Sequence, residues 1–261
     1  MTLFIHEMKQ NRISIIIWSV VISFMLCVSI IIYPEMSSQM DEMTQMMSEM
    51  GSFSTAFGLD EMNFGEFPGY YGIECGNVLG LGGAMFAAIV AISALAKEEK
   101  DKTSEFLLTH PIKRSKIVTS KLVSVISQII ILNVIVNIFA NICAFAIGEG
   151  DGIPSRLLIG LAFLLMQIEI ACICFGISAF ITKGFYGLGI GTAMIFYFMN
   201  IISNLTEEAE VIKYITPFGY TDAAYIINEN ALEFKYLVTG LIISAIGIVL
   251  SYIKFTKKDI K

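Results

Sequence analysis

The sequence predicts an all-α membrane protein with six transmembrane helices, and three observations carry that prediction. Of the 261 residues, 56% are hydrophobic and only 15% are charged, with a mean hydropathy of +0.73, which is outside the range of soluble globular domains. Six apolar runs are each long enough for a helix that crosses a hydrocarbon core, which takes about 20 residues. The runs are continuous rather than alternating, which excludes a transmembrane barrel. They cover Ile13 to Tyr33, Gly76 to Ala96, Leu122 to Ile147, Leu157 to Ile181, Phe185 to Ile202 and Tyr236 to Ile253.

The distribution of positive charge predicts how these helices are oriented. If the N-terminus is cytoplasmic, 14 of the 17 Lys and Arg residues fall on the cytoplasmic side and three on the outside. Seven of the 14 lie between residues 97 and 121. Because positive residues are retained on the cytoplasmic side, both termini and this loop are expected there. The net charge of −6 argues against nucleic acid as a partner.

The N-terminal segment and the first loop have contrasting patterns. Residues 1–12 mix apolar and charged side chains as a short helix in the inner membrane interface would. The loop of residues 34–74 carries eight acidic residues and no Lys or Arg, which predicts an external position. Within it, Met36, Met40, Met43, Met47 and Met50 recur at helical spacing. We interpret them as a packing surface, although thioethers at this spacing are also ligands for Cu(I).

Small residues at intervals of four predict close helix packing. Gly72, Gly76 and Gly80 have this spacing at the start of the second span, and Gly187 and Gly191 repeat it in the fifth. Such a spacing lets two membrane helices approach closely.

Polar residues within the spans are the candidates for a translocation path. Asn133, Asn137 and Asn141 lie four apart on one face of the third span, and Gln167 and Glu169 lie in the fourth. One interpretation of the asparagines is interhelical hydrogen bonding, worth about 0.6 kcal/mol per bond. The other is a hydrophilic lining. A carboxylate at bilayer depth costs several kcal/mol unless it is neutralised or hydrated, so Glu169 either lines a cavity or is a buried, protonated packing group.

The connection of residues 204–235 is expected to re-enter the outer leaflet. Its middle is too apolar and aromatic for a solvated loop, and Pro217 and Gly219 interrupt it too often for a full span. A pair of short helices satisfies the backbone best in that setting.

The basic loop of residues 97–121 predicts a short helix with an exposed apolar knob. Thr103 or Ser104 can cap it, Glu105 lies in its first turn, and Pro111 stops it. The knob is Phe106, Leu107 and Leu108. The basic residues that follow, which include Arg114, suit a contact with anionic lipid. Three exposed apolar residues between charged flanks favour docking of a soluble partner.

Motifs for catalysis are absent from the sequence. There is no GxxxxGK[ST], so the chain has no P-loop of its own, and the two histidines do not form an HExxH motif. We therefore expect no catalytic residue, no metal site and no cofactor in this chain.

One set of residues resembles the signature of ABC-2 type transporter permeases, the membrane subunits of ATP-binding cassette exporters. The signature is approximately E-x-x-x-G-T-x-E-x-L-L-x-x-P-[IV]-x-R with a Lys downstream, and Lys102 stands here in place of its usual Gly. The matching residues are Glu98 and Glu99, Thr103, Glu105, Leu107 and Leu108, Pro111, Arg114 and Lys121. The external sequence FSTAFGLDEMNFGEFPGYYG (53–72) and the motif YITPFGY (214–220) extend the resemblance over most of the chain.

The resemblance implies a single permease domain over residues 1–261. Thr103 to His110 would form a coupling helix in a groove of a separate P-loop ATPase subunit, which binds ATP and Mg. Pro217, Phe218 and Tyr220 would belong to the external re-entrant pair. A second permease chain, identical or homologous, would complete the transporter in a bacterial cytoplasmic membrane, often for export.

Two other functions are consistent with the residues alone. A proton-coupled secondary transporter would use Glu169, although the two halves of the chain show no convincing repeat. A membrane sensor would bind its ligand through the acidic, Met-rich external loop.

Overall fold

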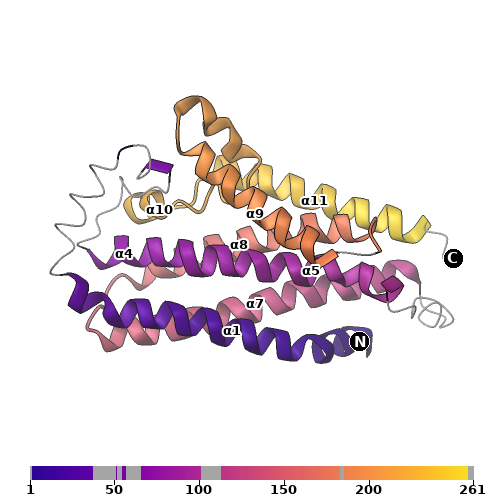
Figure 1. Cartoon of the computed structure of the whole chain (residues 1–261), viewed down its shortest axis with the longest axis horizontal. Coiled ribbons are helices and arrows are strands. Elements are labelled where there is room, and N and C mark those ends of the chain that lie inside the picture. The colour runs from indigo at the N-terminus through magenta and orange to yellow at the C-terminus, as the bar shows by residue number, and fades with distance from the viewer. Residues whose placement is uncertain are drawn as a thin grey trace.

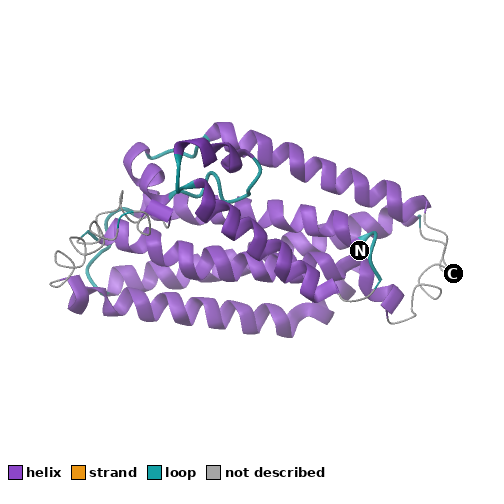
Figure 2. Cartoon of the chain, turned by 45° about the horizontal axis from the view of Figure 1, so that its top comes forward, coloured by secondary structure: helices purple, strands orange, loops and turns teal. Residues whose placement is uncertain are grey.

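The computed structural model describes residues 2–37, 51, 55–56, 66–100, 113–182 and 185–257, and every regular element in these ranges is helical (Figure 2). Six helices in the described chain are long and apolar enough to cross a membrane. The predicted all-α class and the six spans are therefore confirmed for this part of the chain.

The first span is one helix, α1, from Thr2 to Ser37. Residues 2–12 continue into it without a break, so the short interfacial helix predicted for residues 1–12 is not a separate element. Its 36 residues extend about 54 Å at 1.5 Å per residue, well beyond the hydrocarbon core. Pro34 lies inside the last turn of α1, just after the predicted apolar run. There its ring removes a single backbone hydrogen bond.

The second span is built from three consecutive helical segments. The α-helix α4 covers Phe67–Glu74, the π-helix η1 covers Cys75–Leu81, and the α-helix α5 covers Gly82–Lys100. The helical chain therefore begins within the predicted external loop, where Pro68 occupies the first turn, a position that needs no backbone N–H. The widened η1 turns reach the bundle interior, since Cys75, Leu79 and Gly80 are buried.

The remaining spans match their predicted apolar runs with ends that differ by a few residues. They are α7 (Arg114–Ala146), α8 (Ile153–Ser178), α9 (Phe185–Ser203) and α11 (Phe234–Lys257). The helix α7 starts eight residues before its predicted span, because its first two turns are polar and lie beyond the apolar stretch.

Two short helices lie between α9 and α11. The 3-10 helix η2 covers Glu207–Tyr214, and α10 covers Ala223–Glu229. Thr206 caps η2 by accepting from the Ala209 N–H, and Asp222 caps α10 by accepting from the N–H groups of Ala224 and Tyr225. This connection therefore contains two short helices, and the apolar middle of the segment lies between them as a series of turns.

Both termini lie at the same end of the bundle (Figure 1), which we call the terminal end. There α1, α7 and α9 begin and α5, α8 and α11 end, and the opposite end, with η2 and α10, is called distal. Two spans form the centre, because 67% of the most apolar window in the second span and 61% of that in α8 are buried, against 17% in α9. The other helices surround these two.

The helices α8 and α11 meet backbone to backbone at a pair of glycines. A Cβ placed on Gly176 would lie 2.8 Å from the carbonyl oxygen of Gly247, and one on Gly247 would lie 2.6 Å from that of Cys172. By contrast, nothing in the described chain lies within 4 Å of a Cβ placed on Gly76, Gly187 or Gly191. This crossing therefore uses glycines outside the predicted four-residue stripes. Of Gly76, Gly80, Gly187 and Gly191 in those stripes, Gly80 alone has a close neighbour in the described chain, the ring of Phe163.

Candidate functional site

The predicted docking helix falls almost entirely outside the described residues. Thr103, Ser104, Glu105, Phe106, Leu107, Leu108 and Pro111 belong to residues 101–112. Arg114 is described and is the first residue of α7, where its guanidinium donates to the carbonyl oxygen of Thr256 at 3.1 Å. This bond joins the start of α7 to the end of α11 at the terminal end.

A buried ion pair lies close to the two described ends of that segment. The ammonium of Lys121 donates to Glu7 Oε1 at 2.9 Å and to the carbonyl oxygen of Ala94 at 2.7 Å. The Lys121 and Glu7 side chains are only 1% and 10% exposed. One ammonium therefore connects three helices: α1 through Glu7, α5 through Ala94, and α7 through Lys121 itself.

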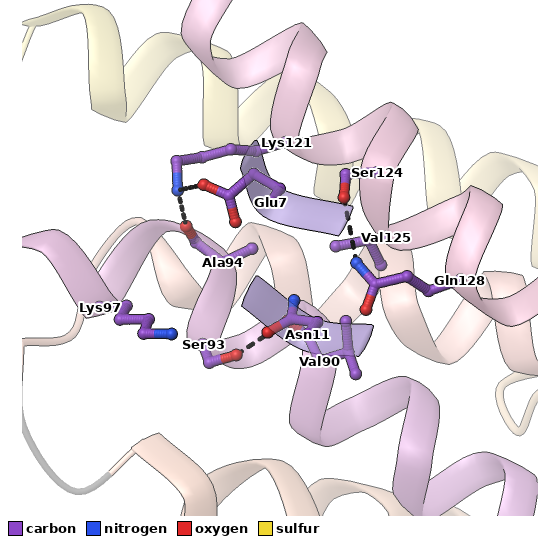
Figure 3. Close-up of a pocket in the computed structure, with 10 residues that line it drawn as sticks. All are labelled: Glu7, Asn11, Val90, Ser93, Ala94, Lys97, Lys121, Ser124, Val125 and Gln128. Carbon is purple, nitrogen blue, oxygen red and sulfur yellow. Dashed lines mark hydrogen bonds and ion pairs between the residues drawn. The ribbon is translucent and has the colours of Figure 1, made fainter. Parts of the chain in front are cut away.

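The ion pair forms one wall of a small polar cavity of about 10 Å³ (Figure 3). The other lining residues are Asn11, Val90, Ser93, Lys97, Ser124, Val125 and Gln128. Gln128 is 1% exposed and donates to Ser124 at 3.0 Å, while its Oε1 atom has no hydrogen-bond partner among the described residues. The volume is about that of one water, and such a water would satisfy this acceptor.

Deeper in the bundle, two predicted path residues contact each other. Asn133 Nδ2 on α7 donates to Gln167 Oε1 on α8 at 2.6 Å, and Gln167 Nε2 donates to the carbonyl oxygen of Leu79 in η1 at 3.2 Å. Both side chains are buried. The Gln167 amide packs directly over Gly83, where a Cβ would overlap it. The amides thus tie three helical segments together.

The other two asparagines continue this line toward the distal end. Each donates to the carbonyl oxygen four residues earlier on α7, at 2.9 Å. Asn137 packs over Gly160 of α8, where a Cβ would overlap its amide. Asn141 Oδ1 accepts from Arg156 Nε at 3.0 Å. All three asparagines therefore face α8, but only Asn133 and Asn141 form hydrogen bonds with it. The Oδ1 atoms of Asn133 and Asn137 have no hydrogen-bond partner among the described residues.

Arg156 closes the distal end of the α7–α8 hairpin. Its guanidinium is buried, with the residue 3% exposed, and it donates to the carbonyl oxygens of Glu149, Gly150 and Asp151 in the connection between the helices. It also lies 5.8 Å from the centre of the Phe67 ring, within the range of a cation–π contact. These bonds satisfy carbonyl oxygens just after α7, and a cation near the C-terminus of α7 also interacts favourably with the helix dipole.

Glu169 is separate from the amide line and contacts the distal segment instead. Its Oε2 atom accepts from the hydroxyl of Tyr220 at 3.0 Å, and its carboxyl packs over Gly240 of α11. The residue is 4% exposed. Glu169 therefore joins α8 to the turns before α10 at the surface of α11.

The predicted re-entrant residues are buried against the helices. Pro217, Phe218 and Tyr220 are all buried, the Phe218 ring lies 5.8 Å from that of Tyr197, and Thr216 donates to the carbonyl oxygen of Phe196 at 2.9 Å. The turns are therefore held on α9 as well as on α8.

The start of α11 is fixed to the distal segment by a carboxylate. Glu210 in η2 accepts from the Tyr236 hydroxyl at 2.6 Å and from the Lys235 ammonium at 3.3 Å. The hydrogen bond from Tyr236, followed by that from Lys235, lowers the pKa of Glu210. The carboxylate is thus kept in its charged form.

Sequence reasoning missed the ion pair and the role of Arg156. Lys121 was noted only as part of the signature, and Glu7 only as one charge of the N-terminal segment. A usable signal was present, because Lys121 is followed directly by an apolar run in which a lone ammonium needs a partner.

The fold and these sites define a polytopic α-helical membrane protein whose interior polar groups connect helices. Among the described residues, no group of three or more His, Cys, Asp or Glu side chains is placed to hold a metal ion. A family model described as ABC-2 family transporter protein matches residues 1–260. The chain therefore belongs to the ABC-2 transporter family, as the signature residues indicated. Comparison with curated proteins and with solved structures found no match.

Proposed function

We propose that this chain is the permease subunit of an ATP-driven exporter and works with a separate P-loop ATPase subunit. The observation that carries the proposal is the match of the transporter family over residues 1–260. This sequence has no P-loop, and in this account a separate subunit that binds ATP and Mg supplies the energy.

The arrangement of the terminal end supports docking of that subunit there. The helices α5 and α7 flank residues 101–112, which carry the apolar knob, and the charge distribution favours a cytoplasmic position for this end. A groove on the ATPase would receive Phe106, Leu107 and Leu108. Hydrolysis of ATP would then move the flanking helices and switch the accessibility of the path.

A second permease chain, identical or homologous, would complete the path in a bacterial cytoplasmic membrane. Large apolar side chains are exposed along the described helices, which suits contact with lipid or with such a chain. Candidate path residues are Asn133, Asn137, Asn141, Gln167 and Glu169. In this account their polar side chains would line the path.

The proposal is tested by purification of the tagged chain in mild detergent, followed by mass spectrometry and an ATPase assay of the eluate. We expect the wild-type chain to retain a P-loop ATPase. A variant with Phe106, Leu107 and Leu108 all changed to Asp should insert normally but lose it, while the matched loop variant Lys102→Ala should keep it. A wild-type eluate without any ATPase would contradict the proposal.

A further inference from the structure

The junction of Glu7, Lys121 and Ala94 is placed to report movement of the segment between α5 and α7. Ala94 lies less than two turns before the last residue of α5, and Lys121 lies about two turns after the first residue of α7. Both helices that flank residues 101–112 therefore take part in the junction: α5 provides the carbonyl acceptor, and α7 provides the ammonium. The third member, Glu7, belongs to α1, which is distant in sequence.

The bonds of the junction are short, directional and protected from water. At 2.9 and 2.7 Å they are charge-assisted hydrogen bonds at their normal length. With only 1% of the Lys121 side chain exposed, the ammonium has no bulk solvent to exchange into when the helices shift. A displacement of α5 or α7 therefore pulls on α1 through Glu7.

Stability alone is a weak reason for such a pair. Burying two charges costs desolvation, and replacement of a buried ion pair by apolar residues of similar volume is often neutral or stabilising. What the pair adds is a fixed distance between named atoms on α1, α5 and α7, and setting how helices align is the best-attested role of buried polar groups. The pair is therefore better suited to fix how α1 sits on α5 and α7 than to hold the bundle together.

We propose that Lys121 and Glu7 are positioning residues that transmit movement of the ATPase-docking segment to α1. This inference rests on the proposed function, since it needs an ATPase that moves the segment. In this account α1 follows α5 and α7 when the ATPase closes, and it does so because the junction joins all three helices.

The test compares nucleotide-free and vanadate-trapped complexes of the full chain with its captured ATPase by hydrogen exchange. In the wild type, we expect a nucleotide-dependent change in exchange both at residues 113–120 and at residues 2–12. The double variant Glu7→Leu with Lys121→Met removes the charges and keeps the volume. It should keep the ATPase, the wild-type thermal midpoint and the response of residues 113–120, but lose the response of residues 2–12.

A double variant that retains the full response of residues 2–12 would overturn the inference and leave the proposed function intact. So would a wild-type complex in which residues 2–12 do not respond. Absence of any captured ATPase on the wild type would instead refute the proposed function. If the double variant fails to fold, Glu7→Gln keeps the shape and one acceptor oxygen. We expect at least a twofold smaller response of residues 2–12 in that variant, and an unchanged response would again overturn the inference.

Discussion

The glycine crossing of α8 and α11 allows a sharp test of the packing. Replacing Gly176 by Ala adds one methyl group at the point where it faces Gly247. The new Cβ would lie 2.8 Å from the Gly247 carbonyl oxygen and 3.0 Å from its Cα. Both neighbours are backbone atoms, so no side chain can rotate out of the way.

The cost can be estimated from the overlap. Ordinary contacts of a Cβ begin near 3.4 Å, so the two helices would have to separate by about half an ångström at the crossing. Overpacking of this kind costs about 1–3 kcal/mol. The matched control is Gly191→Ala in α9, where the added Cβ meets nothing within 4 Å in the described chain. There the better helix propensity of Ala should make the change neutral or slightly stabilising.

The two variants can be compared by unfolding in mixed detergent micelles, followed by circular dichroism. We expect Gly176→Ala to unfold at a clearly lower denaturing-detergent fraction than the wild type, and Gly191→Ala to unfold at the same fraction or a higher one. Equal stabilities of the two variants would refute the close approach of α8 and α11.

Three further predictions concern interior polar contacts. A double-mutant cycle of Gly83→Ala and Gln167→Ala should give a coupling energy of about 1 kcal/mol in the same unfolding assay. The reason is that the new methyl group displaces the Gln167 amide from its two hydrogen bonds, an effect that is absent once Gln167 is replaced. Additive effects of the two substitutions would contradict this contact. Tyr220→Phe should increase hydrogen exchange of the turns before α10 and leave that of α7 unchanged, because it removes only the bond to Glu169. Arg156→Lys should destabilise the chain by about 2 kcal/mol, since an ammonium cannot reproduce the forked donors to three carbonyl oxygens; wild-type stability would show that the fork is not needed.

The transmembrane spans were predictable from sequence, whereas the side-chain contacts between them were not. Apolar length is a local property, so six runs sufficed to identify six helices. The spacing of Asn133, Asn137 and Asn141 likewise put them on one face. The pairing of Glu7 with Lys121 depends on which helices are neighbours, and two residues more than a hundred positions apart carry no local sign of that.

The glycines illustrate the same limit. A four-residue spacing describes one helix and predicts that it can be approached closely, but not by which partner. Gly187 and Gly191 have the spacing, yet no part of the described chain lies against them. Gly176 and Gly247 lie on different helices and form a contact only because α11 crosses α8 at that depth. A contact between elements requires matching positions on both, which no single-segment pattern contains.

Among the described residues, a buried cation near each end of the bundle joins α7 to its neighbouring helices. At the distal end Arg156 holds the α7–α8 hairpin through three carbonyl oxygens, and between the ends Asn133 and Gln167 join the same two helices. The two helices are therefore expected to move as one unit. At the terminal end Lys121 connects that unit to α1 and α5. Because α7 has 33 residues, a displacement near its first turns is carried along about 50 Å of helix to the opposite end, where Arg156 ties α7 to α8.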